Sequence, residues 1–319
     1  MSNQARRDFL KNFGAFSAAA LASTWAYGAT DNAALARQFK LGAISDGFSM
    51  DFEEALKLMK GYGLEWVEIR NVWGVYNTEA SPEQIRKIKD LMNQYGFRIS
   101  VVDTALFKCT LPGTTPVVTL KDAYPYSGQM DLLKRAADRA HTWGTDKLRG
   151  FAFWRVADPA GVVGRIAEEL GKAGEVAKGA GLRVVIEDEP TTNVGTAHES
   201  ARLLAAVKAS NVGANWDCGN GCVRGEIPYP DGYNALPKDR IWHMHLKGVA
   251  CGAGLTKCHE DFPDQGSIDL VGQFRALRRD HYTGTMSLEC EFSAPGMSHQ
   301  QTTQRSMEGL LRVLAKAAA

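Results

Sequence analysis

Short apolar runs alternate with longer amphipathic segments along almost the whole chain, and this alternation restricts the possible folds more than any single motif. The short runs are rich in branched residues, and the longer segments repeat their apolar residues at helical spacing. Strict alternation favours parallel strands, and eight strand–helix units are the number found in a (β/α)8 barrel. The predicted strands are residues 41–45, 66–69, 98–103, 147–153, 182–187, 212–217, 241–246 and 284–292.

The main alternative fold is an open, doubly wound sheet, whose first strand usually leads into a glycine-rich phosphate turn. Here the corresponding segment reads SDGFSMDF and contains no such turn. The helix signals fit the barrel: one predicted helix has Ser81 as N-cap and Pro82 in its first turn, and ends at Gly96. We therefore expect a single α/β domain, a (β/α)8 barrel over residues 37–319, without an internal linker.

The first residues resemble an export signal rather than part of the barrel. Arg6 and Arg7 are followed by Phe-Leu-Lys and then by an alanine-rich stretch that is too short to span a membrane. Residues 1–36 are therefore predicted to be a twin-arginine-type signal peptide and short linker, cleaved after Gly28 or Ala36, with a chance amphipathic N-terminus as the alternative. The predicted destination is the periplasm, which the chain would reach already folded.

The composition argues against several classes of protein. A formal net charge of +1 without a basic stripe argues against nucleic-acid binding, and no apolar run approaches the roughly 20 residues of a membrane span. Six cysteines are present; Cys218 with Cys222, or Cys251 with Cys258, are close enough in sequence to pair in an oxidising compartment. The sequence leaves this pairing open, and it also leaves a homo-oligomer possible.

Each of the last four predicted strands carries two polar residues, spaced two apart, near its end. Side chains alternate along a strand, so each pair shares one face, and the C-terminal ends of barrel strands form active sites. The segment VVIEDEP is the clearest case, because burying unpaired carboxylates at the end of a strand is costly. The pairs are Glu187 with Glu189, Asn215 with Asp217, His243 with His245, and Glu289 with Glu291.

A divalent metal ion would supply the missing counter-charge. Carboxylates combined with an imidazole suit Mn²⁺, Mg²⁺ or Co²⁺, and they can also hold Zn²⁺. We expect one such ion, with one carboxylate of the 187–189 cluster as a ligand.

These segments resemble the xylose-isomerase-like TIM barrels, the family of sugar phosphate isomerases and epimerases, from about residue 40 to the end. The resemblance is carried by VEI, VVIED, WDCGN, HMHLKG and the tail DQGSIDL…HYTGTMSLECE. It implies that Glu187, Asp217, His245 and Glu289 are the metal ligands, with Glu189 as the alternative to Glu187.

Two positions depart from the family's pattern. Many epimerases of the family have a histidine three residues after the metal-binding aspartate, where this chain has Asn220, and the family's HLKD ends here in Gly248. An amide can hydrogen-bond a hydroxyl group but cannot act as a general acid. Phosphate-binding turns are also missing, which argues against a phosphorylated substrate.

The first predicted function is isomerisation or epimerisation of a ketose or related sugar. The metal would stabilise an enediolate, and the resemblance implies that Glu187 and Glu289 remove and return the proton. The second is a lyase or dehydratase reaction on a keto-sugar, keto-inositol or oxidised glycoside, in which Lys247 or His243 assists the leaving group. A non-catalytic sugar-binding barrel is a third possibility, and a DNA-repair endonuclease is disfavoured by the near-zero charge.

Further residues near the strand ends are candidates for sugar contacts. Trp154 and Arg155 offer an aromatic face and a guanidinium group, although core packing is the default for such residues; Glu68 could equally have a structural role. Long loops at 104–128, 221–238 and 249–267 are expected to cover the substrate. The predicted substrate-binding set is Glu189, Asn220, His243, Lys247, Glu291, Trp154 and Arg155.

Overall fold

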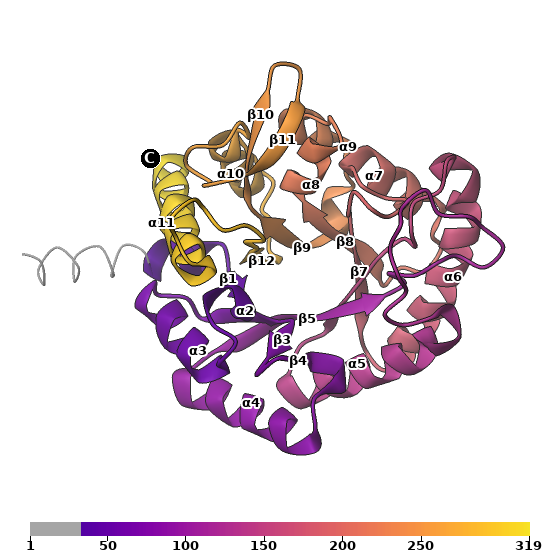
Figure 1. Cartoon of the computed structure of the whole chain (residues 1–319), viewed down its shortest axis with the longest axis horizontal. Helices are drawn as coiled ribbons and strands as arrows, with labels where there is room; N and C mark the ends of the chain where they lie inside the picture. The colour runs from indigo at the N-terminus through magenta and orange to yellow at the C-terminus, as the bar shows by residue number, and fades with distance from the viewer. Residues whose placement is uncertain (1–32) are drawn as a thin grey trace, which may run out of the picture.

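Eight parallel strands form a closed barrel in a computed structural model, which describes residues 33–319. Going round the barrel, the strand order is β1-β12-β9-β8-β7-β6-β5-β2, so the last strand closes on the first (Figure 1). The predicted fold class is thereby confirmed. The barrel strands are β1 (Leu41–Ile44), β2 (Trp66–Ile69), β5 (Arg98–Leu106), β6 (Lys147–Gly150), β7 (Arg183–Glu187), β8 (Val212–Asp217), β9 (Ile241–Leu246) and β12 (Thr285–Leu288).

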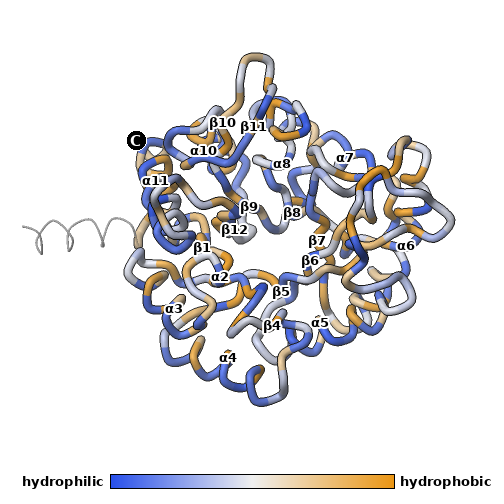
Figure 2. The backbone as a smooth tube through the Cα atoms, in the orientation of Figure 1, coloured by the Kyte–Doolittle hydropathy of each residue, from blue (hydrophilic) through white to orange (hydrophobic). Residues whose placement is uncertain are grey.

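The helices surround the barrel as an outer ring (Figure 1), and polar and apolar residues alternate along them (Figure 2). The sequence signals act as predicted in α4, where the Ser81 side chain caps the first turn and Gly96 ends the helix with a left-handed backbone. The main helices are α3 (Phe52–Gly61), α4 (Pro82–Tyr95), α5 (Gln129–Trp143), α6 (Pro159–Gly179), α7 (Ala197–Ala206), α10 (Leu270–Arg279) and α11 (His299–Ala318), with shorter α2 (Ser45–Phe48), α8 (Cys218–Val223) and α9 (Tyr233–Ala235).

Two predicted strands end earlier than expected. The strands β6 and β12 stop at Gly150 and Leu288, whereas the predicted runs extend to residues 153 and 292. Neighbouring parallel strands pair with β12 only as far as Leu288, because the chain then leaves the barrel at its mouth. Glu289 and Glu291 therefore lie on the segment after the strand, not within it.

The loops at the barrel mouth contain short strands that the sequence did not predict. The segment after β9 forms a hairpin of β10 (Gly248–Gly252) and β11 (Thr256–Asp261), and the segment after β2 forms β3 (Asn71–Val72) with β4 (Val75–Tyr76). Of the candidate cysteine pairs, Cys251 and Cys258 form a disulfide across the first hairpin, while Cys218 and Cys222 are free and buried.

The predicted signal peptide falls mostly on residues 1–32, which lie outside the described residues. Within the described part, none of the helices is both long and apolar enough to cross a membrane.

Candidate metal centre

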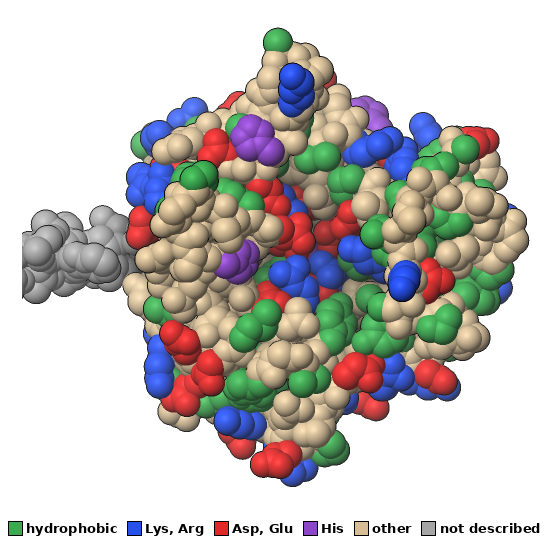
Figure 3. Space-filling model, viewed as in Figure 1, with side chains coloured by type: hydrophobic (Ala, Val, Ile, Leu, Met, Phe, Trp, Pro, Cys, Tyr) green, Lys and Arg blue, Asp and Glu red, His purple; other side chains and the backbone are tan. Residues whose placement is uncertain are grey.

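The four predicted metal ligands come together at the C-terminal end of the barrel. Glu187 and Asp217 are the last residues of β7 and β8, His245 lies near the end of β9, and Glu289 directly follows β12. One ligand atom from each residue lies within 4.8 Å of the other three, and all four side chains are buried. Acidic and basic side chains gather in the central hollow of the barrel in Figure 3.

The imidazole of His245 lies at the centre of this cluster. Its Nδ1 atom is 3.1 Å from Oε2 of Glu289, 3.6 Å from Oε1 of Glu187 and 4.0 Å from Oδ2 of Asp217. Three carboxylates and one imidazole are therefore directed at a common point, which is the donor set that hard and borderline divalent cations accept.

The hydrogen bonding of Asp217 provides a test of whether a metal ion fits. Its Oδ1 atom accepts hydrogen bonds from the backbone amides of Gly219 and Asn220, at 2.8 and 3.0 Å. Its Oδ2 atom is buried and accepts no hydrogen bond, although Nζ of Lys247 lies 3.0 Å away. Buried oxygens rarely lack a hydrogen-bonding partner unless they have another role. This oxygen faces His245 and the other carboxylates and has only an ion pair with Lys247, so the residues present fit a metal ion.

Glu68 contacts the side of the His245 ring that faces away from the three carboxylates of the cluster. Its carboxylate lies 3.1 Å from Nε2 of His245 and 3.0 Å from Nε2 of His243, and all three side chains are fully buried. A carboxylate on the far nitrogen fixes the orientation of a metal-binding imidazole. His243 is held on its other side by Thr285, at 2.7 Å, so it lies beneath the site rather than facing a substrate.

Two arginines that the sequence did not reveal hold the two glutamates of the cluster. Arg149 donates to Oε2 of Glu187 at 2.7 Å, and Arg70 donates to Oε1 of Glu289 at 3.0 Å. Each arginine also pairs with a second carboxylate, Asp103 and Asp46 respectively. Arg149 lies on β6 and Arg70 just after β2, where no pair of polar residues marked the strand end.

These contacts keep the glutamates ionised. Burial raises the pKa of Glu187, but the charges of Arg149 and His245 outweigh this effect and lower that pKa to about 2. Burial likewise opposes ionisation of Glu289, and the charges of Lys247 and His245 hold its pKa well below the usual value. Both carboxylates are therefore available as anionic ligands.

Lys247 brings a buried positive charge to the same place. Its Nζ atom lies 3.0 Å from Oε2 of Glu289 and 3.2 Å from Oε2 of Glu291, in addition to its contact with Asp217. Burial lowers the pKa of this ammonium group, but the surrounding carboxylates raise it well above the usual value. Asn220 lies between Lys247 and Glu187, 3.4 Å from each.

A cavity of about 180 Å³ opens beside the cluster. Glu187, Glu189, Glu289 and Glu291 line it together with basic residues that include Arg70 and Arg149. The ion pair between Lys108 and Glu189, at 3.0 Å, forms another part of the wall. Glu189 and Glu291, two of the predicted substrate contacts, thus line the cavity.

Trp154 and Arg155 are not among the residues that line this cavity. Nε1 of Trp154 donates to Asp122 at 2.6 Å, and Arg155 forms an ion pair with Glu199 at 2.6 Å. Trp154 is thus held by a loop and Arg155 by the first turn of α7, away from the cavity.

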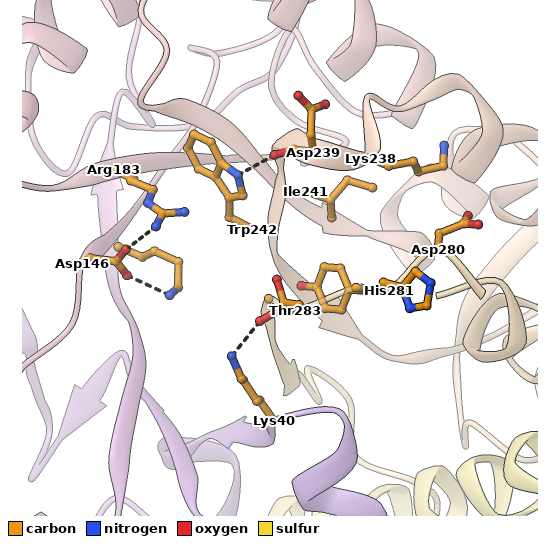
Figure 4. A pocket seen from close by; sticks show the side chains of 13 residues that line it. Lys40, Asp146, Arg183, Lys238, Asp239, Ile241, Trp242, Asp280, His281 and Thr283 are labelled. Carbon is orange, nitrogen blue, oxygen red and sulfur yellow. Dashed lines mark hydrogen bonds and ion pairs between the residues drawn. The ribbon is translucent and has the colours of Figure 1, made fainter. Parts of the chain in front are cut away.

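A larger cavity, of about 740 Å³, lies at the opposite end of the barrel, where the strands begin (Figure 4). Its cations already have partners: Lys40 donates to the carbonyl of Thr283 at 2.8 Å, and Arg183 pairs with Asp146 at 3.0 Å. This end of a (β/α)8 barrel contributes to stability rather than to chemistry. Its greater volume therefore does not make it the functional site.

The sequence matches a known family over most of the barrel. Residues 56–313 match the profile of the family described as "Xylose isomerase-like TIM barrel". The chain belongs to this family. Its members share the barrel, and the match includes all four residues of the cluster.

Individual relatives are more distant. An inosose dehydratase from Clostridium botulinum is 23% identical over 279 residues, covering 75% of this chain and 82% of the relative. The chain spans 46% of the length of the other inosose dehydratases that it matches, including one from Clostridium beijerinckii.

Solved structures support the fold alone, because their identities are low. A xylose isomerase-like TIM barrel protein from Mycobacterium smegmatis, in complex with magnesium, has a TM-score of 0.65 and 17% identity, over 89% of this chain and 99% of that one. A 3-keto-D-glucoside 4-epimerase from E. coli has a TM-score of 0.64 and 16% identity, over 86% and 98%.

Proposed function

We propose that this protein is a metal-dependent enzyme that removes a proton next to the carbonyl of a sugar-like substrate and then eliminates a leaving group, as a lyase or dehydratase. The observation that carries the proposal is the convergence of Glu187, Asp217, His245 and Glu289 beside the ammonium group of Lys247. Such a site offers both a cation-binding pocket and an acid.

Glu187, Asp217, His245 and Glu289 would hold one divalent ion, Mn²⁺, Mg²⁺, Co²⁺ or Zn²⁺. When bound, the ion supplies Lewis acidity, which stabilises negative charge that develops on a carbonyl oxygen. The magnesium complex of the Mycobacterium smegmatis structure supports a divalent ion in this fold.

The protein's own residues divide the acid and base roles. Glu187 faces the cavity and is ionised, so one of its oxygens can accept the proton next to the carbonyl. Lys247 is protonated and lies just behind the cavity wall, in contact with Glu289 and Glu291, so its Nζ would give a proton to a departing hydroxyl or alkoxide once a substrate displaces one of these contacts. Glu189 and Glu291 line the cavity and can accept hydrogen bonds from substrate hydroxyl groups.

Two observations favour a keto-inositol or keto-sugar without a phosphate group. The relative that aligns over 82% of its own length is an inosose dehydratase, and a dehydratase needs one base and one acid, as this site provides. The three cations that line the cavity are each paired with one of its glutamates, so none is left to bind a phosphate; they are Arg70, Lys108 and Arg149.

Epimerisation is the second candidate. Glu187 and Glu289 both line the cavity and could exchange a proton with opposite faces of a substrate. The barrel of the 3-keto-D-glucoside 4-epimerase supports this alternative at the level of the fold.

The two reactions differ in their products. Purified protein loaded with Mn²⁺ is incubated in D₂O with 2-keto-inositol and, separately, with a 3-keto-glucoside, and the mixture is followed by NMR. Loss of water or of the aglycone supports the lyase; deuterium incorporation with inversion at carbon supports the epimerase. Neither product with either substrate, while a metal ion is bound, would overturn the proposal.

We also propose export to the periplasm by the twin-arginine route. The Arg6–Arg7 pair motivates this, and the Cys251–Cys258 disulfide supports an oxidising compartment. The test is cell fractionation of the full chain beside a variant with both arginines changed to lysine. Equal distribution of the two proteins would contradict export by this route.

A further inference from the structure

Three cysteines outside the metal centre bring their sulfur atoms together. Cys251 on β10 and Cys258 on β11 form a disulfide, and the free thiol of Cys222 in α8 lies 3.3 Å from Sγ of Cys251. All three sulfur atoms lie within 4.8 Å of one another. In Figure 1 the hairpin that carries the disulfide stands beside α8. A thiol in contact with a disulfide can exchange with it.

We propose that Cys222, Cys251 and Cys258 form a thiol–disulfide exchange site with two covalent states. The thiolate of Cys222 attacks Sγ of Cys251, so that a Cys222–Cys251 bond forms while the Cys251–Cys258 bond breaks. Cys258 leaves as a thiolate and takes up the proton that Cys222 released. One disulfide and one thiol are present before and after the exchange, so no external oxidant or reductant is consumed.

The exchange changes which segments the disulfide joins. In the first state the disulfide joins β10 to β11, within one hairpin. In the second state it joins the hairpin to α8. This helix starts directly after Asp217, and β10 starts directly after Lys247. The second state therefore connects covalently the two segments that carry a metal ligand and the buried ammonium group.

The neighbouring contacts already hold these segments close together. The Sγ atom of Cys258 is 3.5 Å from the backbone carbonyl of Cys222, and α8 packs against both strands of the hairpin. The backbone amide of Glu291 donates to Glu260 on β11 at 2.9 Å, so the hairpin also touches the cavity wall. The attacking sulfur must approach in line with the Cys251–Cys258 bond, which would place Cys222 Sγ about 5.3 Å from Cys258 Sγ. The three sulfur atoms lie within 4.8 Å of one another, so the hairpin has to turn relative to α8 before the exchange.

Trapping of the released thiol tests the proposal on the wild-type protein. The native protein is incubated with a low or a high concentration of N-ethylmaleimide at mildly alkaline pH, and the remaining thiols are then blocked in denaturant with an isotopically heavy maleimide. Trypsin cleavage after Lys208, Arg224, Lys247 and Lys257 places the three cysteines on separate peptides. Fragmentation of the 209–224 peptide separates Cys222 from Cys218.

Exchange predicts that the light label accumulates on Cys258 over minutes to hours, together with a cross-linked pair of peptides that contains Cys222 and Cys251. Cys222→Ala should leave Cys258 unlabelled, whereas Cys109→Ala, a buried cysteine outside the cluster, should behave as wild type. Light label on Cys222 alone at every reagent concentration, or no label on Cys258 before the chain unfolds, would overturn the proposal. The wild-type result decides the question even when a variant is unstable.

Discussion

The two halves of the barrel mouth provide different chemistry. The second half, from β7 to β12, supplies the four atoms directed at the metal position. The first half, from β2 to β6, supplies Arg70 and Arg149, which neutralise two of those ligands, and Glu68, which orients a third. Three buried carboxylates would repel one another without these counter-charges. Counter-charge therefore comes from both halves: Arg70 and Arg149 on the opposite wall hold Glu289 and Glu187, and Lys247 beside the ligands holds Asp217 and Glu289.

We expect the largest loss of metal binding and activity from a change in the second half of the barrel mouth, β7 to β12, which supplies the proposed ligands. Glu289→Gln removes one anionic ligand and should reduce a stoichiometric metal content to near zero and abolish turnover. Metal analysis of protein purified without chelator measures the first effect. The matched control is Glu291→Gln, two residues later and half exposed, which should keep the metal. Full metal content in Glu289→Gln would remove that residue from the ligand set.

Lys247→Met separates metal binding from catalysis. Loss of the proposed acid should reduce kcat by roughly 10²–10⁴-fold, the usual contribution of general acid catalysis. Metal binding should persist, because the variant loses a cation that contacts two ligand oxygens. Titration with Mn²⁺ and initial rates on the substrate found by NMR measure the two quantities. An unchanged kcat would assign Lys247 a purely electrostatic role.

Arg149→Met removes a counter-charge that the first half of the barrel mouth, β2 to β6, supplies. It leaves Glu187 and Asp103 buried without their partner, so the free energy of unfolding should fall by about 3–5 kcal/mol in the presence of chelator. Urea unfolding monitored by fluorescence measures this change. The control is Arg183→Met at the other end of the barrel, whose half-exposed ion pair with Asp146 should contribute about 0–1 kcal/mol. A similar loss in the free energy of unfolding in both variants would contradict the role of Arg149 as a counter-charge for the buried carboxylates.

Glu68→Gln should weaken metal binding by roughly 10–100-fold, because His245 loses the anion that fixes its ring. Calorimetric titration gives the affinity, and Glu65→Gln, in a partly exposed ion pair just before β2, is the control. An affinity equal to that of the wild type would show that Asn215, 3.2 Å from the same nitrogen, is enough to orient the ring.

The last prediction changes no residue and concerns the dependence of metal affinity on pH. Burial raises the pKa of Asp217 from 3.8 to about 6, with Lys247 opposing the shift. The folded, metal-free protein therefore binds this proton more tightly than the unfolded chain, and the stability contributed by the proton is lost as the pH rises from about 4 to about 6. Metal must displace this proton and also the proton of His245, because the carboxylates around that imidazole overcome burial and raise its pKa well above the usual value. Affinity should therefore rise about a hundredfold per pH unit below 6 and about tenfold per unit above it. A tenfold slope throughout would mean that Asp217 is already ionised.

The sequence predicted the half of the site in which spacing carries information. Polar residues two apart in Asn215–Asp217 and His243–His245 point inward because strand side chains alternate, and the barrel brings their ends together. It could not reveal Arg149, a single arginine within the run KLRG, because its partners Glu187 and Asp103 are 38 and 46 residues away in the chain.

The predictions that differ from the structure concern segments that follow the ends of the barrel strands. Trp154 and Arg155 follow β6, but they form hydrogen bonds with Asp122 in a loop and with Glu199 in α7, away from the cavity. Local sequence does not encode such distant partners. The hairpin of β10 and β11 was expected only as a long loop, because its residues TKCHED show no clear alternation of apolar and polar residues.

The pairing of β1 with β12 has a consequence for the order of folding. This contact joins the two ends of the barrel sequence, so the ring cannot close until almost the whole chain has been synthesised. Glu289, the last of the four ligands, directly follows the closing strand. Metal binding should therefore coincide with closure of the barrel and stabilise the closed form. A chain truncated before β12 would lose both the closed barrel and the metal site. On the proposed export route, a protein that crosses the membrane already folded takes its ion from the cytoplasmic pool.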